Sequence, residues 1–339
     1  MRALVITEHG PPEVLRVQER PDPVPGPGEV RVRVHAAGIN FADLLARVGL
    51  YPDAPKPPCV VGYEFGGVVE SLGDGVDDFA VGDRVLGGCD FGGYAELVVT
   101  TTGNLVPLPE DWSFEEGAAV SVVYATAYAA LVRYGNVREG ERILVQAAAG
   151  GVGIAATQVG KILGAEVFGT ASASKHDAVR GFGVDHAIDY RSEDFVKEVR
   201  RITGEKRPLD LAMDAIGGRS FKKSFSLLHA GGRLVCFGVS AVQSGERGSR
   251  PRALMALAQM PFFHPVKLMS ESKSVIGLNM KTLWDEKGSL DDYVAPLRQW
   301  MEDGSIRPVV AKAFPLEQGA EAHRYLHEGK NVGKVVLTL

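Results

Sequence analysis

Residues 142–165, RILVQAAAGGVGIAATQVGKILGA, decide the fold class, because they read as a strand, a glycine turn and a helix. RILVQA is a short apolar run typical of a buried strand, and IAATQVGKILGA favours a helix. Between them, three glycines fall within four residues, where each would weaken a regular element. This order is typical of the first strand-to-helix turn of a dinucleotide-binding sheet.

The turn AAAGGVG, residues 147–153, aligns with the fingerprint G-x-G-x-x-G at Ala148, Gly150 and Gly153, so only the first glycine is missing. A helix amino terminus offers unpaired N–H groups and a partial positive charge, which suit a pyrophosphate. Gly150 would let the backbone approach the phosphates, and Gly153 would let helix and strand pack closely. The alternative is a tightly packed turn that binds nothing.

The strand expected after this turn indicates which coenzyme is bound. An NAD site carries Asp or Glu about 20 residues after the loop, where it binds the ribose 2′-hydroxyl. This chain has Thr170, Ser172 and Lys175 there, and the first acid is Asp177. Hydroxyls and a cation suit a 2′-phosphate, so the sequence predicts NADPH rather than NADH. The alternative, that Lys175 is only a solvated lysine, stays open.

Composition excludes several classes of protein. The 37 basic and 42 acidic residues give a net charge of -5, which does not indicate a nucleic-acid binder. The three cysteines, Cys59, Cys89 and Cys236, form neither a disulfide framework nor a CxxC pair. No apolar run approaches a membrane span, and the start of the chain reads as a strand and not as a signal peptide. We therefore expect a cytoplasmic protein without a transmembrane segment or a nucleic-acid partner.

The sequence pattern changes twice along the chain. Residues 1–124 contain short alternating strands separated by glycine and proline turns. Residues 125–266 alternate helical patterns with short apolar strands, which predicts a parallel doubly wound sheet that binds NADPH. Residues 267–339 return to strands and loops, and end in the strand GKVVLTL.

Six motifs resemble those of medium-chain dehydrogenases/reductases of the zinc-free, quinone-oxidoreductase type, and most of all the branch of synaptic vesicle membrane protein (vesicle amine transport) homologues. They are AAGINFADLLARVGLY (36–51), GYEFGGVVESLGDGV (62–76), VGDRV (81–85), AAAGGVG (147–153), VFGTASASKH (167–176) and KNVGKV (330–335). The resemblance implies an α/β fold, in which both ends of the chain form a GroES-like β domain and a doubly wound Rossmann domain is inserted between them. It also accounts for Ala148, since this branch often has Ala or Ser in place of the first glycine.

The resemblance also implies functional residues. Tyr51 matches the tyrosine proposed as proton donor in zinc-free enoyl reductases, although it could equally be a packing residue at the rim. Asn40 is the second candidate catalytic residue, and with Thr126 it would form hydrogen bonds near the nicotinamide. The other positions implied to bind the coenzyme are Ala149, Gly150, Gly151, Val152, Gly153, Thr170, Ser172, Lys175, Tyr190, Phe237, Gly238, Val239, Asn279 and Lys334.

Zinc ligands of the related dehydrogenases are missing from this chain. The resemblance puts Asn40 in the region of the first cysteine and Tyr63 where the ligand histidine would stand, while Glu64 remains with an expected structural role. Structural zinc of that family needs four closely spaced cysteines, and this chain has three isolated ones. His323 and His327 could share a helix face, but no third ligand accompanies them. We therefore expect no metal.

Hydride transfer to an already activated acceptor is the chemistry that remains without a metal. A quinone, or the β-carbon of an enone or alkenal, is the expected acceptor, so the substrate would be a small apolar electrophile. Two alternatives stay open: an NADPH-binding membrane- or vesicle-associated adaptor or trafficking protein with little turnover, and a tailoring enoyl reductase of a lipid or polyketide pathway.

Two further segments carry expectations. Residues 251–269, PRALMALAQMPFFHPVKLM, are rich in Met and Phe, which favours a lid over an apolar pocket, with packing in the core as the alternative. SVIGLNM, residues 274–280, reads as a strand. Family members commonly join their sheets at such an edge, so we expect a homodimer.

Overall fold

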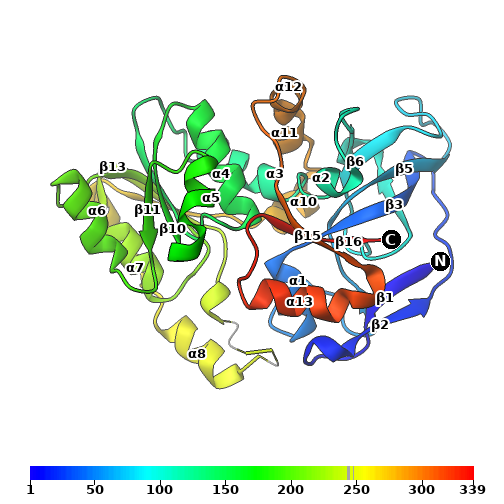
Figure 1. Ribbon diagram of the computed structural model, residues 1–339, viewed down its shortest axis with the longest axis horizontal. Helices are drawn as coiled ribbons and strands as arrows, with labels where there is room; N and C mark the ends of the chain where they lie inside the picture. The colour runs from blue at the N-terminus through cyan, green and yellow to red at the C-terminus, as the bar shows by residue number, and fades with distance from the viewer. Residues whose placement is uncertain (243–244, 247) are drawn as a thin grey trace. The chain divides into compact units, whose positions relative to one another are not determined.

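The computed structural model describes residues 1–242, 245–246 and 248–339. The chain divides into two compact units (Figure 1). The first unit comprises Met1–Ala125, Gly245–Gly248 and Met280–Leu339, and the second comprises Thr126–Ser244 and Ser249–Asn279. The second unit thus runs past the expected end at residue 266, because the strand at 274–277 pairs with its sheet.

The second unit is built on a six-stranded sheet in the order β11-β10-β9-β12-β13-β14. Every neighbouring pair is parallel, so the expected doubly wound Rossmann sheet is confirmed. The strands are β9 (Arg142–Val145), β10 (Glu166–Ala171), β11 (His186–Asp189), β12 (Leu209–Asp214), β13 (Leu228–Cys236) and β14 (Ser274–Gly277). The strand order reverses at β9, and in such sheets ligands bind at the carboxyl ends of the strands where the order reverses.

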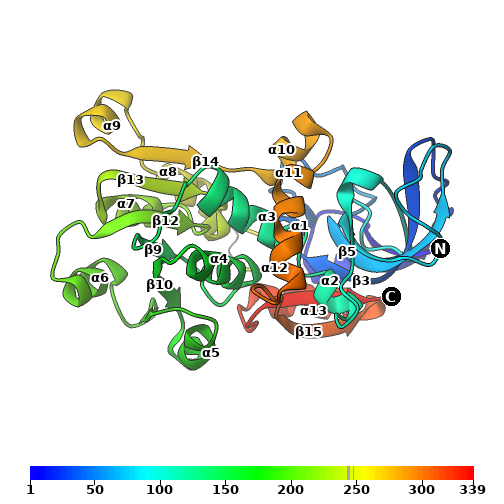
Figure 2. The ribbon, with the colours of Figure 1, turned by 90° about the horizontal axis from the view of Figure 1, so that it is seen from above.

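Helices lie before and between these strands, and several of them pack on the sheet (Figure 2). They are the π-helical turn η3 (Ala129–Arg133), α4 (Gly151–Ile162), η4 (Ala173–Lys175), α5 (His176–Gly181), α6 (Phe195–Thr203), α7 (Arg219–Ser226), η5 (Ser240–Val242), α8 (Arg250–Ala258) and α9 (Pro265–Glu271). The strands β9, β10 and β12 are buried along almost their whole length, which is why their sequences are rich in apolar residues. Leu144, Phe168, Ile188 and Leu234 lie in the resulting core.

The first unit contains two sheets. The larger has the order β15-β16-β3-β5-β6-β8, with β7 paired to β3, and the smaller has the order β2-β1-β4. The strands are β1 (Arg2–Ile6), β2 (Leu15–Glu19), β3 (Glu29–Ile39), β4 (Cys59–Val60), β5 (Glu64–Leu72), β6 (Arg84–Gly88), β7 (Leu97–Thr101), β8 (Leu105–Pro107), β15 (Val310–Pro315) and β16 (Lys334–Thr338). β16 therefore joins the two ends of the chain in one sheet by pairing with β3.

Short helices complete the first unit. They are η1 (Pro12–Val14), α1 (Phe41–Arg47), η2 (Thr102–Asn104), α2 (Phe114–Gly117), α10 (Met280–Lys287), α11 (Asp291–Val294), η6 (Ala295–Leu297), α12 (Arg298–Glu302), η7 (Leu316–Gln318) and α13 (Gly319–His327). Helix α3 (Val123–Tyr128) contains the boundary between the units. Side chains of β1, β3, β5, β16 and α1 form the main apolar core, which includes Ile6, Val32, Phe65 and Leu337.

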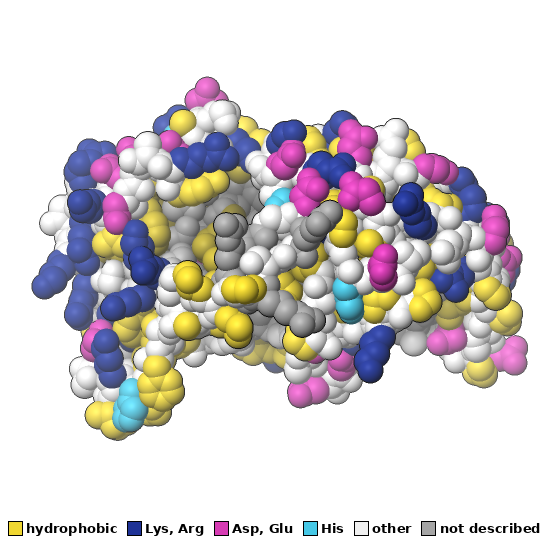
Figure 3. All heavy atoms as spheres, turned by 90° about the horizontal axis from the view of Figure 1, so that it is seen from below, with side chains coloured by type: hydrophobic (Ala, Val, Ile, Leu, Met, Phe, Trp, Pro, Cys, Tyr) yellow, Lys and Arg dark blue, Asp and Glu magenta, His cyan; other side chains and the backbone are white. Residues whose placement is uncertain are grey.

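Residues 251–269 cover most of α8 and α9 and the connection between them, and most of their large apolar side chains point to solvent. The exposed ones are Leu254, Met255, Leu257, Phe262, Val266 and Met269. The face drawn in Figure 3 shows such apolar side chains gathered over α8. The alternative that this stripe is core is therefore wrong for these residues. No helix in the described part of the chain is long and apolar enough to cross a membrane.

Candidate functional site

The glycine turn after β9 has a geometry that depends on two positions. Ala147 adopts a left-handed conformation, with φ of 56°, and its carbonyl accepts a hydrogen bond from the Gly150 N–H at 2.9 Å. A Cβ on Gly153 would lie 2.3 Å from the carbonyl oxygen of Ala147 and 2.6 Å from the Cα of Ala148. Close packing of the helix on the turn therefore excludes any side chain at Gly153.

Gly150 is the N-cap of α4, and no side chain caps this helix. Among the described residues, the Ala147 carbonyl oxygen, at 3.4 Å, is the one close neighbour of a Cβ built on Gly150. The first N–H groups of a helix have no partner within the helix, so an anion could reach those of Gly151, Val152 and Gly153. Together with Ala149, these residues fit a pyrophosphate.

A buried series of hydrogen bonds, which the sequence did not indicate, holds the glycine turn in place. The Ser224 hydroxyl donates to Asp214 Oδ2 at 2.8 Å and lies 3.4 Å from the Gln146 side-chain nitrogen. The Thr170 hydroxyl donates to Gln146 Oε1 at 2.7 Å and accepts from the Ala147 N–H at 3.1 Å. The series therefore connects the end of β12 to the left-handed residue of the turn, across β9 and β10.

Thr170 consequently has a different task from the one expected. Its side chain is buried, and its hydroxyl already donates to Gln146 and accepts from Ala147. Thr170 therefore holds the turn and has no hydroxyl proton left for a 2′-phosphate. Ser172, the next polar residue, is also buried, and its Oγ lies 3.4 Å from Ser174 Oγ.

Lys175 ends the turn η4 after β10 and is accompanied by a second cation. Burial, and then the charge of Arg191, lower the pKa of Lys175. Arg191 follows Tyr190, which is half exposed just beyond β11, and its guanidinium lies 5.9 Å from the centre of the Tyr190 ring. Sequence reasoning missed Arg191, although its place directly after Tyr190, a predicted coenzyme-binding residue, was a usable signal.

The acidic side chains near these cations already have partners. Asp177 is fully exposed on α5 and pairs with Arg180 at 3.4 Å. Asp189 accepts hydrogen bonds from the Arg191 N–H at 3.1 Å and from the Ser192 hydroxyl at 2.7 Å. Its carboxylate is therefore used within its own turn.

Other predicted coenzyme ligands of the second unit follow the carboxyl ends of its strands. Phe237, Gly238 and Val239 come directly after β13, and a Cβ on Gly238 would be 3.0 Å from the Ala215 carbonyl oxygen. Asn279 is exposed two residues beyond β14. Thr126, in contrast, is buried in α3.

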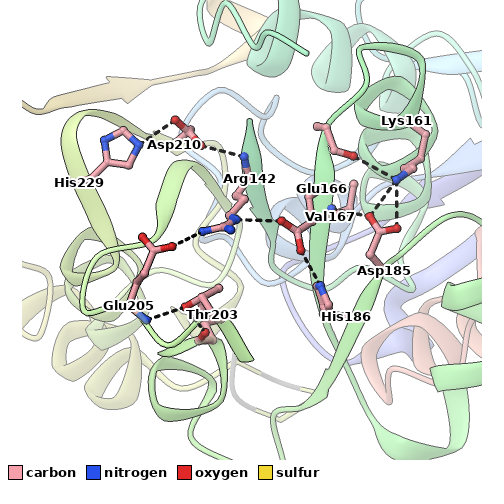
Figure 4. A network of polar contacts seen from close by, with 12 residues as sticks. Arg142, Lys161, Glu166, Val167, Asp185, His186, Thr203, Glu205, Asp210 and His229 are labelled. Carbon is pink, nitrogen blue, oxygen red and sulfur yellow. Dashed lines mark hydrogen bonds and ion pairs between the residues drawn. The ribbon is translucent and has the colours of Figure 1, made fainter. Parts of the chain in front are cut away.

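A conspicuous polar network lies at the opposite, amino ends of the strands (Figure 4). Arg142 and His186 both bind Glu166, with distances of 2.9 and 2.7 Å, and His229 binds Asp210 at 2.8 Å. Further pairs join Arg142 to Glu205 and Lys161 to Asp185. Since ligands of such sheets bind at the carboxyl ends, we assign this network to strand alignment and not to the site.

Tyr51, the predicted proton donor, follows α1 in the first unit and packs against its main apolar core. Burial raises the pKa of Tyr51 to about 12. The phenol therefore keeps its proton throughout the neutral range, as a proton donor must. Tyr63 lies in the same unit and is almost fully buried, with its ring 4.9 Å from Phe91.

Asn40 and Lys334 lie in contact, and Lys334 is bound to side chains of the first unit instead of facing a coenzyme. Lys334 Nζ donates to Asn40 Oδ1 at 2.6 Å and forms an ion pair with Glu64. The side chains of Lys334 and Glu64 are 4% and 0% exposed. Lys334 is therefore a buried partner of Asn40 and Glu64, where the resemblance implied a coenzyme ligand.

Candidate metal ligands do not gather in the described part of the chain, where no group of three or more His, Cys, Asp or Glu could hold an ion. His323 is buried against the edge of Tyr94, with ring centres 6.1 Å apart. Burial holds the pKa of His323 well below its usual value, so this ring stays neutral. The pKa of His327 is also lowered, again first by burial.

Two family models match the chain. Residues 26–110 match the alcohol dehydrogenase GroES-like domain, and residues 182–337 match the zinc-binding dehydrogenase family. The synaptic vesicle membrane protein VAT-1 homolog of Homo sapiens is 39% identical over 344 residues, covering 99% of this chain and 86% of the relative. The quinone oxidoreductase of Homo sapiens is 32% identical over 343 residues, covering 100% of this chain and 98% of the relative.

Solved structures that superpose on this chain belong to the same kinds of protein. The quinone oxidoreductase of Escherichia coli complexed with NADPH superposes with a TM-score of 0.86 and 30% identity, with full coverage of both chains. The CurK enoyl reductase also reaches 0.86, at 27% identity, covering 99% of this chain and 98% of that one. With its GroES-like unit, its parallel Rossmann sheet and these relatives, the chain belongs to the medium-chain dehydrogenase/reductase family of oxidoreductases, and it resembles the quinone oxidoreductases within it.

Proposed function

We propose that the protein is an NADPH-dependent reductase that transfers a hydride to a quinone or to an activated C=C bond without zinc. The observation that carries the choice of coenzyme is the pair Lys175 and Arg191 beyond β10 and β11, where Asp177 already pairs with Arg180 and Asp189 already accepts hydrogen bonds within its own turn. Two cations favour a 2′-phosphate and leave a plain ribose hydroxyl without its usual carboxylate partner.

NADPH, when bound, supplies the hydride. Residues 149–153 at the start of α4 would hold its pyrophosphate, and Ser172, Lys175, Tyr190 and Arg191 would surround its 2′-phosphate. The E. coli quinone oxidoreductase complexed with NADPH supports this assignment, since it matches this chain over its whole length. The buried series of hydrogen bonds through Gln146 and Thr170 fixes the turn before the coenzyme arrives, which lowers the entropic cost of binding.

The acceptor is proposed from the residues that stand where zinc ligands would be. Asn40 and Tyr63 replace the cysteine and histidine, so an alcohol would have no Lewis acid to stabilise its alkoxide. A quinone or enone needs no such activation. In this proposal the protonated phenol of Tyr51 donates the proton that an enolate requires after hydride addition.

Steady-state oxidation of NADPH by the purified protein tests the proposal. The panel contains a naphthoquinone, a cyclic enone, an alkenal and an enoyl thioester, with a saturated alcohol plus NADP⁺ as the control. We expect turnover with at least one of the first three and none with the alcohol. Reduction of the enoyl thioester alone would favour the tailoring reductase, and turnover confined to the alcohol would overturn the proposal.

A second candidate is an NADPH-binding protein that associates with membranes and turns over little. The exposed apolar side chains of α8 and α9 favour it, and a pocket of about 250 Å³ beside α9 is rimmed by Lys222 and Lys267. Flotation with vesicles of phosphatidylcholine, with and without phosphatidylglycerol, distinguishes the two. Binding only to the anionic vesicles, without turnover on any acceptor, would favour this candidate.

A further inference from the structure

Three strand ends meet at one edge of the larger sheet in the first unit. Lys334 is the first residue of β16, Asn40 directly follows β3, and Glu64 is the first residue of β5. β3 pairs antiparallel with both β16 and β5, with Ile39 opposite Val335 and Ala37 opposite Phe65. Strand pairing therefore brings together three polar residues that are far apart in the sequence.

Their hydrogen bonds leave Asn40 one orientation. Lys334 Nζ donates to Asn40 Oδ1 at 2.6 Å, and Asn40 Nδ2 donates to Glu64 Oε1 at 3.0 Å. An ammonium can only donate and a carboxylate can only accept, so a flipped amide would oppose both partners. The amide oxygen of Asn40 therefore faces Lys334 and its nitrogen faces Glu64.

The carboxylate of Glu64 is itself held in place. Its Oε2 accepts from the Val122 N–H at 2.8 Å, and its Oε1 also pairs with Lys334. A Cβ on Gly38 would lie 2.8 Å from Glu64 Cγ, so glycine in β3 is what admits this side chain. Glu64, Lys334 and Asn40 thus form a preformed unit, with both charges withdrawn from solvent.

We infer that Lys334 is a positioning residue for Asn40, and not a ligand of the coenzyme. It neutralises Glu64 and fixes the direction of the Asn40 amide. Its importance for turnover rests on the proposed function and on the position near the nicotinamide that the family resemblance implies for Asn40. The orientation of the amide does not rest on that function, so it is tested separately.

Side-chain amide signals in the ¹H–¹⁵N NMR spectrum test the orientation. The Asn40 pair is assigned as the signals that Asn40→Ser removes. We expect Lys334→Met to shift this pair while other Asn and Gln signals stay in place, and Lys330→Met, an exposed lysine paired with Glu328, to leave it unchanged. An Asn40 pair that is unaffected by Lys334→Met would overturn the inference.

Kinetics and calorimetry then separate positioning from coenzyme binding. For Lys334→Met we expect kcat to fall about 10- to 100-fold, the usual result of misplacing a group near the reacting atoms. The Kd for NADPH should stay within about twofold, and Lys334→Arg, which keeps the donors and charge, should recover part of kcat. A large rise in the Kd for NADPH with unchanged kcat would instead make Lys334 a coenzyme ligand.

Folding of Lys334→Met is a separate concern, because it leaves Glu64 buried without its counter-ion. The double variant Lys334→Met/Glu64→Gln removes both charges together and serves as the stable alternative. It should show the same loss of kcat and the same displaced Asn40 signals. If the double variant folds and keeps the wild-type kcat and spectrum, the inference fails. If the wild type itself shows no turnover, the proposed function fails, while the NMR result still decides the orientation.

Discussion

Ala148 and Gly169 form a complementary pair: a Cβ on Gly169 of β10 would lie 2.9 Å from the Cβ of Ala148. The methyl group that replaces the first glycine of the fingerprint therefore occupies the space that the neighbouring strand leaves by having no side chain. Val184 crowds the same place, at 2.9 and 3.0 Å from that Cβ. The departure at Ala148 is accommodated by packing and leaves the turn intact.

Gly169→Ala should destabilise the protein by about 1–3 kcal/mol, the usual cost of inserting a methyl group into a packed core. The measurement is urea unfolding followed by circular dichroism. Ala148→Gly in the same chain should recover part of the loss, since it removes one of the two contacts. Equal stability of Gly169→Ala and wild type would show that Ala148 and Gly169 are not coupled.

Lys175→Ala and Arg191→Ala should each weaken NADPH binding by about 1.5–3 kcal/mol, the range for a hydrogen bond to a charged group. NADH lacks the 2′-phosphate and should be nearly unaffected. Calorimetric titration of both coenzymes provides the test, with Arg180→Ala, an exposed arginine on the neighbouring helix, as the matched control. Tyr190→Phe should be milder, because it removes one neutral hydroxyl. A wild type that prefers NADH would contradict the assignment.

Tyr51→Phe should slow enone reduction by about 10²–10⁴-fold, the contribution of a positioned general acid. Quinone reduction should change less, since a hydroquinone takes its protons from water. The pKa of Tyr51 is about 12, so enone turnover of the wild type should not fall between pH 8 and 10 through loss of this proton. Full enone activity in Tyr51→Phe would make it a packing residue.

Asp43 should make stability depend on pH in an unusual direction. Burial raises the pKa of Asp43 from 3.8 to about 6, so the folded protein holds this proton more strongly than the unfolded chain. Its contribution to stability is therefore lost as the pH rises from about 4 to 6. Asp43→Asn removes the titration, so its stability relative to wild type should rise by on the order of 2 kcal/mol from pH 4 to 7.

Urea unfolding at intervals of one pH unit measures this difference. Asp177→Asn, which changes an exposed carboxylate, is the control and should follow wild type. Asn at position 43 can still accept the hydrogen bonds from the Asn40 N–H and the Tyr94 hydroxyl, both at 2.7 Å in wild type. If the stability difference between Asp43→Asn and wild type stays constant across the pH range, the raised pKa of Asp43 is contradicted, while the packing of the side chain is not.

The free edge of β14 predicts a homodimer. This strand is the outermost of its sheet, and α9, which directly precedes it, exposes Val266 and Met269. Pairing of two copies would cover an edge that is otherwise open to aggregation. Light scattering at micromolar concentration should give the dimer mass, and Val266→Glu/Met269→Glu should give the monomer. Val81→Glu, at an exposed position of the first unit, should remain dimeric.

The alternation of strands and helices over residues 125–266 was sufficient to predict the parallel sheet, because buried strands, glycine turns and helices each leave a local pattern. The end of the second unit was harder to predict from the sequence. The strand at 274–277 was visible in SVIGLNM, but its membership in the sheet follows from pairing with β13, which no local pattern encodes. The exposure of α8 and α9 could not be predicted for the same reason, because an apolar stripe has the same sequence pattern whether it is buried or exposed to solvent.

Local sequence was enough to predict the glycine turn, because it depends on which residue types stand at fixed spacings, and the preference for NADPH stays a prediction from the same kind of pattern. The partners of side chains were decided by the tertiary structure. Thr170 turned out to support the loop, Arg191 to accompany Lys175, and Lys334 to hold Asn40, 294 residues away in the chain. Such partnerships arise when strands pair and helices pack. Burial then favours a partner for most polar atoms, and only the folded chain determines which one is within reach.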